Sequence, residues 1–85
     1  MKFRKKPIVI EAEQWFPGKE IEGVFTEYRE VIGCQIPFMC VYTLEGKMDV
    51  KVGDWIITGI ECEKYPCRDS IFRATYEPVD GEWPL

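Results

Sequence analysis

The sequence predicts an α+β protein: a small curled antiparallel sheet of about five strands, with one main amphipathic helix packed on it and one short helix before the last strand. Two observations predict this class. Apolar residues alternate with charged ones in several short runs, the period of two that is typical of half-buried strands. Between these runs, residues 19–32 place apolar side chains at intervals of three and four, as an amphipathic helix does.

The length of the chain sets the size of its core. With 85 residues, of which 46% are apolar and 14% aromatic, the chain is expected to form a single domain over residues 1–85 rather than a disordered segment. A domain this small buries only roughly 60–65% of the surface of its unfolded chain, so we expect modest stability. The expected core anchors are Trp15, Trp55, Phe72 and Tyr76.

The first predicted strand is Phe3–Trp15, in which Ile8, Ile10 and Ala12 share one face. Pro7 is expected at the start or on an edge of this strand, because proline has no N–H to donate to a ladder.

The main helix is predicted over Lys19–Ile32, after a turn at residues 16–18. Gly23 would cost about 1 kcal/mol inside this helix, and Gly33 stands where a C-terminal cap is usual. The apolar stripe consists of Ile21, Val24, Phe25, Tyr28, Val31 and Ile32.

A hairpin is predicted from two strands, Gln35–Leu44 and Lys47–Val52, with the reversal at Glu45 and Gly46. The second strand alternates apolar and charged residues without exception, so one of its faces should be buried. Pro37 is expected to keep the first residues of the hairpin out of a central ladder.

A second reversal is predicted at Gly53 and Asp54, where the Asp54 carboxylate can accept backbone N–H bonds and hold the turn. Residues 55–60 are almost continuously apolar, which predicts a strand buried on both faces at the centre of the sheet.

The C-terminal part is predicted as a short helix over Asp69–Ala74, with Asp69 or Ser70 as N-cap. A last strand over Thr75–Val79 and a tail over residues 80–85 would follow.

The composition excludes several kinds of chemistry. The chain has no histidine, so no Ser-His-Asp or Cys-His nucleophile system and no histidine metal cluster can be built from it. Phosphate-binding, dinucleotide, zinc-protease and calcium-loop motifs are also missing. A net charge of −4 disfavours nucleic-acid binding by counterion release. We therefore expect no enzyme, no cofactor and no metal.

The four cysteines, Cys34, Cys40, Cys62 and Cys67, are expected to pack as small apolar side chains. Two disulfides or a tetrahedral zinc site are the alternatives, but the spacing is unusual for a zinc knuckle. Cys67 is a candidate reactive thiol, because it precedes the short helix and lies beside Arg68. Its other interpretation is a turn residue whose sulfur packs against Tyr65 or Phe72.

Two features suggest contact with a partner. Lys2, Arg4, Lys5 and Lys6 form a basic cluster within the first six residues, which is either a solvated terminus or a contact with an anionic partner. Trp83 can dock either on its own domain or on another subunit. Aromatic residues exceed what a small core absorbs, so part of them should form an exposed patch.

No apolar run approaches the roughly 20 residues needed to span a bilayer. The acidic residues after Ile10 are also incompatible with a signal peptide. The protein is expected in the cytoplasm, with its cysteines mostly reduced.

Four segments of the chain form a distinctive ordered pattern: MKFRKKPIVIEAEQW at the start, TLEGKMDVKVGDWIITGI from Thr43, YPC from Tyr65 and IFRATYEPV from Ile71. Together they cover more than half of the chain, and they resemble a family of small uncharacterised proteins encoded by tailed bacteriophages and prophages. Residues 16–40 match no pattern of this family. The resemblance implies a phage or prophage origin and the cytoplasm of a bacterial host, and it supplies no catalytic residue.

Three functions are compatible with the sequence. The favoured one is a non-enzymatic accessory protein that binds a host or phage protein and forms a homodimer, because a marginal core and surplus aromatic residues favour covering surface. The second is a nucleic-acid or nucleotide module, in which the basic cluster contacts phosphate and Tyr42 or Trp55 stacks on a base. The third is a small enzyme that uses Cys67 or carboxylates.

Overall fold

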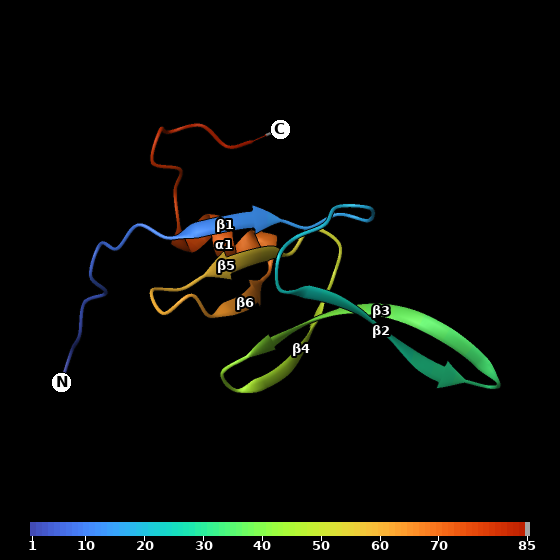
Figure 1. Ribbon diagram of the computed structural model, residues 1–85. Helices are drawn as coiled ribbons and strands as arrows, with labels where there is room; N and C mark the ends of the chain where they lie inside the picture. Colours follow the sequence, from blue (N-terminus) through green and yellow to red (C-terminus); the bar gives the residue numbers. More distant parts are fainter. Residues whose placement is uncertain (85) are drawn as a thin grey trace.

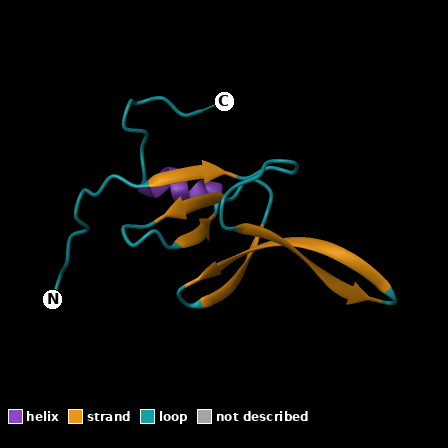
Figure 2. Cartoon of the chain, viewed as in Figure 1, coloured by secondary structure: helices purple, strands orange, loops and turns teal. Residues whose placement is uncertain are grey.

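The computed structural model describes residues 1–84 and contains two antiparallel sheets of three strands each and one short helix (Figures 1 and 2). The α+β class is therefore confirmed, whereas the single sheet of about five strands and the two helices are not. The end of the predicted tail, Leu85, lies outside the described residues. The elements are β1 (Glu11–Gln14), β2 (Val24–Val31), β3 (Cys34–Thr43), β4 (Gly46–Val50), β5 (Trp55–Thr58), β6 (Lys64–Cys67) and α1 (Asp69–Thr75).

The first sheet has the order β1-β5-β6, so β5 is its central strand. Trp55 pairs with Gln14 on one side and with Cys67 on the other. The helix α1 lies against one face of this sheet (Figure 1), and its Phe72 packs on Trp55 and Ile57. The expectation of a strand buried on both faces is confirmed for β5.

The second sheet has the order β2-β3-β4 and is dominated by the long hairpin of β2 and β3, which extends away from the first sheet (Figure 1). The predicted hairpin of β3 and β4 is confirmed, with its reversal just before Gly46. Pro37 pairs only with Tyr28 of β2, because β4 begins to pair with β3 at Met39. As expected, proline therefore stands at an edge.

Two hydrophobic clusters hold the elements together. One fills the first sheet and its helix with Trp55, Ile57 and Phe72. The other joins the two sheets, because Ile56 of β5 meets Val41 and Val50 of the hairpin sheet, with Trp15, Ile21 and Val24 around them. The adjacent β5 residues Ile56 and Ile57 therefore belong to different hydrophobic clusters. Of the expected anchors, Trp15, Trp55 and Phe72 are buried, whereas Tyr76 is only half-buried.

The predicted helix over Lys19–Ile32 is wrong. The chain turns at Gly23, whose φ of +90° is outside the helical region, and then forms β2. β2 pairs with β3 along its whole length, from Val24 opposite Val41 to Val31 opposite Cys34. Aromatic and β-branched residues dominate this stretch, so its preference for a pleated strand prevails over a spacing that also fits a helix. Gly33 accordingly is a hairpin residue and not a helix cap.

Three other elements differ from the sequence prediction. The first strand is shorter than Phe3–Trp15, because its partner β5 ends at Thr58, where the chain turns. Residues 76–79 form no strand. Instead, Tyr76 donates its N–H to the carbonyl of Phe72 and closes the helix. β6 was not predicted, since Pro66 suggests a loop, yet proline is tolerated on an edge strand.

The short helix α1 confirms the prediction of a helix over Asp69–Ala74. The predicted N-cap, Asp69 or Ser70, is wrong. The N-cap residue is Arg68, and no side chain caps the helix. The carboxylate of Asp69 instead accepts hydrogen bonds from side chains of neighbouring strands.

The loop of the β2–β3 hairpin contains a strained residue. Ile32 has a φ of 49° and Gly33 a φ of 74°, the two positive values that a type I′ turn requires. Ile32 is 98% exposed, so no packing offsets the cost of a β-branched residue in this conformation. We expect Ile32→Asn to stabilise the protein by about 1 kcal/mol. Urea unfolding measures this change. Ile32→Val, which keeps the branched side chain, should give no gain, and an equal gain from both variants would contradict the explanation.

Candidate interaction surfaces

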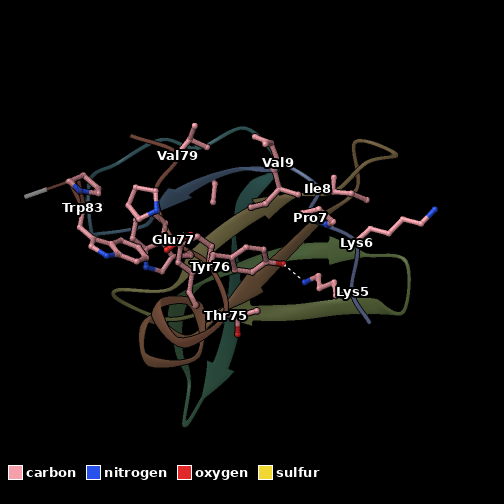
Figure 3. Close-up of a pocket in the computed structure, with 16 residues that line it drawn as sticks. Lys5, Lys6, Pro7, Ile8, Val9, Thr75, Tyr76, Glu77, Val79 and Trp83 are labelled. Carbon is pink, nitrogen blue, oxygen red and sulfur yellow. Dashed lines mark hydrogen bonds between the residues drawn. The ribbon is translucent and has the colours of Figure 1, made fainter. Parts of the chain in front are cut away.

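The two ends of the chain form a groove beside the first sheet (Figure 3). Its volume is about 610 Å³. Lys5 to Ile10 line one side, Thr75 to Val79 line another, and Trp55 and Phe72 contribute from the first sheet and its helix. The groove is mainly apolar, with lysines at its N-terminal end and Glu77 opposite. It holds no pair of carboxylates or nucleophile with a base that would make it a reaction centre.

The basic cluster lies on the N-terminal segment that precedes β1. Lys5 donates a hydrogen bond from Nζ to the hydroxyl of Tyr76 at 3.0 Å, and its Nζ lies 4.6 Å from the centre of that ring (Figure 3). Lys2, Arg4 and Lys6 are exposed. None of the four cations forms an ion pair with an acidic side chain within residues 1–84, so their charges are available to a partner.

Trp83 docks on its own chain. Its ring lies 5.9 Å from the ring of Trp55 and 5.9 Å from that of Phe72, in edge-to-face contact with both. The guanidinium of Arg73 lies 4.4 Å from the centre of the indole. These contacts attach the tail to the first sheet and its helix, which is the first of the two roles expected for Trp83.

The Gly53–Asp54 turn is held as its sequence suggests. The Oδ2 atom of Asp54 accepts the N–H of Lys51 at 2.9 Å, and its backbone carbonyl accepts the N–H of Trp15 at 2.8 Å. Gly53 adopts a φ of +89°. The turn therefore connects β4 to β5 and also binds the end of β1, and Asp54 has a structural role.

Asp69, expected from the sequence only as an N-cap residue, accepts more hydrogen bonds than any other carboxylate of the first sheet and its helix among residues 1–84. Its Oδ1 atom accepts hydrogen bonds from Trp55 Nε1 at 2.8 Å, Arg73 Nε at 2.8 Å and Gln14 Nε2 at 3.2 Å. The bonds from Trp55 and Arg73 lower the pKa of Asp69. One side chain thus links α1 to β1 and β5. Only the i, i+4 spacing to Arg73 could have indicated any of these contacts.

The outer face of the hairpin sheet carries a second polar network, centred on Glu27 of β2. Its Oε2 atom accepts hydrogen bonds from Cys40 Sγ at 2.8 Å and from the Tyr42 hydroxyl at 2.8 Å, and Lys47 Nζ lies 3.4 Å from Oε1. The bonds from Cys40 and Tyr42 are the main reason that the pKa of Glu27 lies below 4.5. This carboxylate stabilises the sheet above its ordinary pKa, and the contribution is lost as the pH falls through the lowered value.

Next to it, Arg29 Nη2 donates to both carboxylate oxygens of Asp49, at 3.0 and 3.1 Å, and the guanidinium lies 4.0 Å from the centre of the Phe38 ring. The charged side chains Glu27, Lys47, Arg29 and Asp49 of this face therefore pair with one another. Tyr42, one of the two aromatic residues expected to stack on a base, donates its hydroxyl to Glu27 in this network. The other, Trp55, is buried and is not accessible to a base.

Because the thiol of Cys40 is buried, we expect the protein to lose stability at high pH. Burial, followed by the hydrogen bond to Glu27, raises the pKa of Cys40 to about 11 from an ordinary 9.0. Between these values the unfolded thiol ionises and the folded one does not, so the free energy of unfolding should fall by up to about 1.4 kcal/mol per pH unit from this group. Cys40→Ala should remove this part of the slope in urea titrations under reducing conditions. Equal slopes for both proteins would contradict the assignment.

The other cysteines show no site for chemistry. All four thiols are free, and Cys34 and Cys62 are exposed. A reactive Cys67 would need a lowered thiol pKa, whereas burial, followed by the nearby charge of Asp54, raises the pKa of this thiol. The described residues contain no cluster of three or more Cys, Asp or Glu side chains that could hold a metal ion.

The free end of the β2–β3 hairpin exposes apolar side chains. The radius of gyration is 15.0 Å, against about 12 Å for a compact domain of this length, and both the hairpin and the N-terminal segment extend from the body (Figure 1). Tyr28 is 64% exposed and Ile32 98%, and Val31 and Ile36 are also exposed. Tyr28, Val31 and Ile32 lie in residues that the sequence predicts as a helix, and Ile36 lies in the predicted strand after it, so their position together on one hairpin was not predictable.

Comparison with models of known protein families, with curated proteins and with solved structures finds no match. Among residues 1–84, no helix is both long and apolar enough to cross a membrane.

Proposed function

We propose that the chain is a non-enzymatic accessory protein that acts by binding another protein and by associating with itself. The observation that carries this proposal is the β2–β3 hairpin, which extends beyond the body (Figure 1) and whose apolar residues Tyr28, Ile32 and Ile36 are exposed. Exposed apolar side chains on an extended element usually mark an interaction surface. The two outer strands, β2 and β4, also have free edges, which are templates for pairing with another chain.

The proposed setting is the cytoplasm of a bacterial host, with a phage or prophage gene as the source. Its support is the resemblance of the four segments from Met1, Thr43, Tyr65 and Ile71 to the phage family. In this setting the partner is a host or phage protein.

The experiment is capture of partners from a bacterial lysate by the tagged protein, with and without nuclease. Tyr28→Ser/Ile36→Thr changes one exposed apolar residue on each face of the hairpin, because Tyr28 pairs with Pro37 and Ile36 with Arg29. Both positions are exposed, so the fold should be retained. The matched control, Leu44→Ser, changes an exposed residue at the β3–β4 turn. A partner that survives nuclease, binds the wild type and the control, and is lost with the double variant supports the proposal. Equal capture by all three proteins contradicts it.

The second candidate, nucleic-acid binding, is favoured by one observation: the basic cluster is exposed and free of acidic partners within residues 1–84. Titration with single-stranded oligonucleotides at low and moderate salt tests it. Binding that weakens steeply with salt, and that is lost on replacing Lys2 and Lys6 with alanine, would favour this candidate.

A further inference from the structure

The N-terminal segment has the pattern of a strand but has no partner. The sequence predicts a strand over residues 3–15, because their side chains alternate between two faces. In the structure only β1, Glu11–Gln14, pairs with another strand, β5. Before β1 the segment runs beyond the end of β5 (Figure 1), and its apolar residues Phe3 and Val9 are exposed, the latter at 75%. A segment with this composition gains stability if a second strand pairs with it.

The hydrogen bonds of Trp15 show which backbone groups of the N-terminal segment point toward β5 and which point toward the open edge of the sheet. Trp15 donates its N–H to Asp54 and accepts the N–H of Gly53, so its backbone groups point toward β5. In a strand, successive residues direct these groups to opposite sides. Even-numbered residues, such as Ala12 and Gln14, therefore direct their N–H and C=O groups to the open edge of the sheet. Pro7 is odd-numbered, so the N–H that it lacks does not interrupt this edge.

The charges of the segment are complementary to those of a second copy in antiparallel orientation. Cations precede the apolar run Ile8-Val9-Ile10 and acids follow it, at Glu11 and Glu13. An antiparallel pair centred on Val9 places Lys5 opposite Glu13 of the second copy, because both lie four positions from the centre. Ile8 is then opposite Ile10, and even-numbered residues face even-numbered ones, as the open edge requires.

We propose that two copies of the chain associate by antiparallel pairing of their N-terminal edges about a twofold axis at Val9, with Lys5 and Glu13 forming a cross-strand pair on each side. The two β1-β5-β6 sheets then become one continuous sheet. This inference rests on the proposed self-association and specifies its surface and register. The interface is self-complementary, as a twofold interface must be.

The contacts that pairing replaces are weak. Ile8 donates its N–H to Lys6 in a local turn, which opens when the segment straightens. Lys5 leaves the hydroxyl of Tyr76, and Glu13 leaves Lys19, which lies 3.8 Å away in an exposed ion pair. Exposed pairs of this kind contribute little to stability, so the cross-strand contacts are sufficient to replace them.

Charge reversal tests the pairing by sedimentation of the full chain over a range of concentrations. Lys5→Glu and Glu13→Lys each place like charges opposite each other twice in the dimer, so each should weaken dimerisation about tenfold. The double variant K5E/E13K should recover it. The double variant has the same residue beside Tyr76 as Lys5→Glu and the same residue beside Lys19 as Glu13→Lys, so recovery relative to the single variants can come only from the cross-strand pair. Glu45→Lys, with the same charge change at the β3–β4 turn, should leave dimerisation unchanged.

Cross-linking tests the register. Opposite residues at a non-hydrogen-bonded antiparallel position have Cα atoms about 4.5 Å apart, which suits a disulfide. In a Cys34→Ser/Cys62→Ser background, Val9→Cys should form a linked dimer under mild oxidation, and Val52→Cys, also at an exposed valine, should not. A dimer insensitive to both charge reversals, or equal cross-linking at the two positions, overturns this inference and leaves self-association standing. A monomer at every concentration overturns both.

Discussion

Replacing Trp55 with alanine is expected to cost about 3–5 kcal/mol of stability, the largest loss from any single substitution considered. Trp55 is 5% exposed and stacks on Phe72 with their ring centres 4.4 Å apart. Its Nε1 also donates to Asp69, which links the helix to the sheet. At roughly 0.05–0.15 kcal/mol per residue, a domain of this length has a total stability of about 4–13 kcal/mol. The substitution should therefore remove a large fraction of the total stability, and it unfolds the protein if that total lies at the lower end of this range.

Circular dichroism with urea unfolding measures this effect, and two variants separate its parts. Trp55→Phe keeps an aromatic ring on Phe72 and loses the N–H donor and part of the buried ring area, so its loss of stability should be clearly smaller than that of Trp55→Ala. Trp83→Ala removes a second indole from the same cluster, but at its periphery, and should cost about 1 kcal/mol. A loss at Trp83 as large as that at Trp55 would mean that the C-terminal tail, and not the β5–α1 contact, holds this core.

Local signals explain why some elements were predictable. The β3–β4 hairpin follows from the alternation of Met48 and Val50 with charged residues and from a turn at Gly46, all within a few positions. The burial of β5 follows from its continuous apolar run. The helix α1 follows from residues 69–74 alone. In each case the local pattern and the tertiary environment favour the same structure.

The errors arise where the tertiary environment decides. The spacing of Val24, Tyr28 and Val31 fits a helix, and only pairing with β3 makes the stretch a strand. Because that pairing was not predictable, neither was the network that brings Glu27 to Cys40 and Tyr42. Asp69 is likewise 55 positions from Gln14, which donates to it. No spacing within the sequence indicates contacts of this range.

The two sheets share only part of their core, and this division leads to the second large effect. Ile56 and Ile57 are adjacent in β5 and are 2% and 1% exposed, yet Ile56 faces the hairpin sheet and Ile57 faces α1. Either residue replaced by alanine should cost about 2–5 kcal/mol. The pair is matched in residue type, strand and burial, so any difference between the variants reports the face from which the side chain was removed.

Hydrogen exchange of the two variants should therefore show different patterns. In Ile56→Ala, the amides of β2, β3 and β4 should lose protection first, because Ile56 joins the hairpin sheet to the body. In Ile57→Ala, the loss should concentrate in β1, β6 and α1, whose cluster contains Ile57. Local opening of this kind is detectable when sub-structures differ in stability. Identical loss of protection in both variants would contradict this expectation and would show that the two sheets unfold as one cooperative unit.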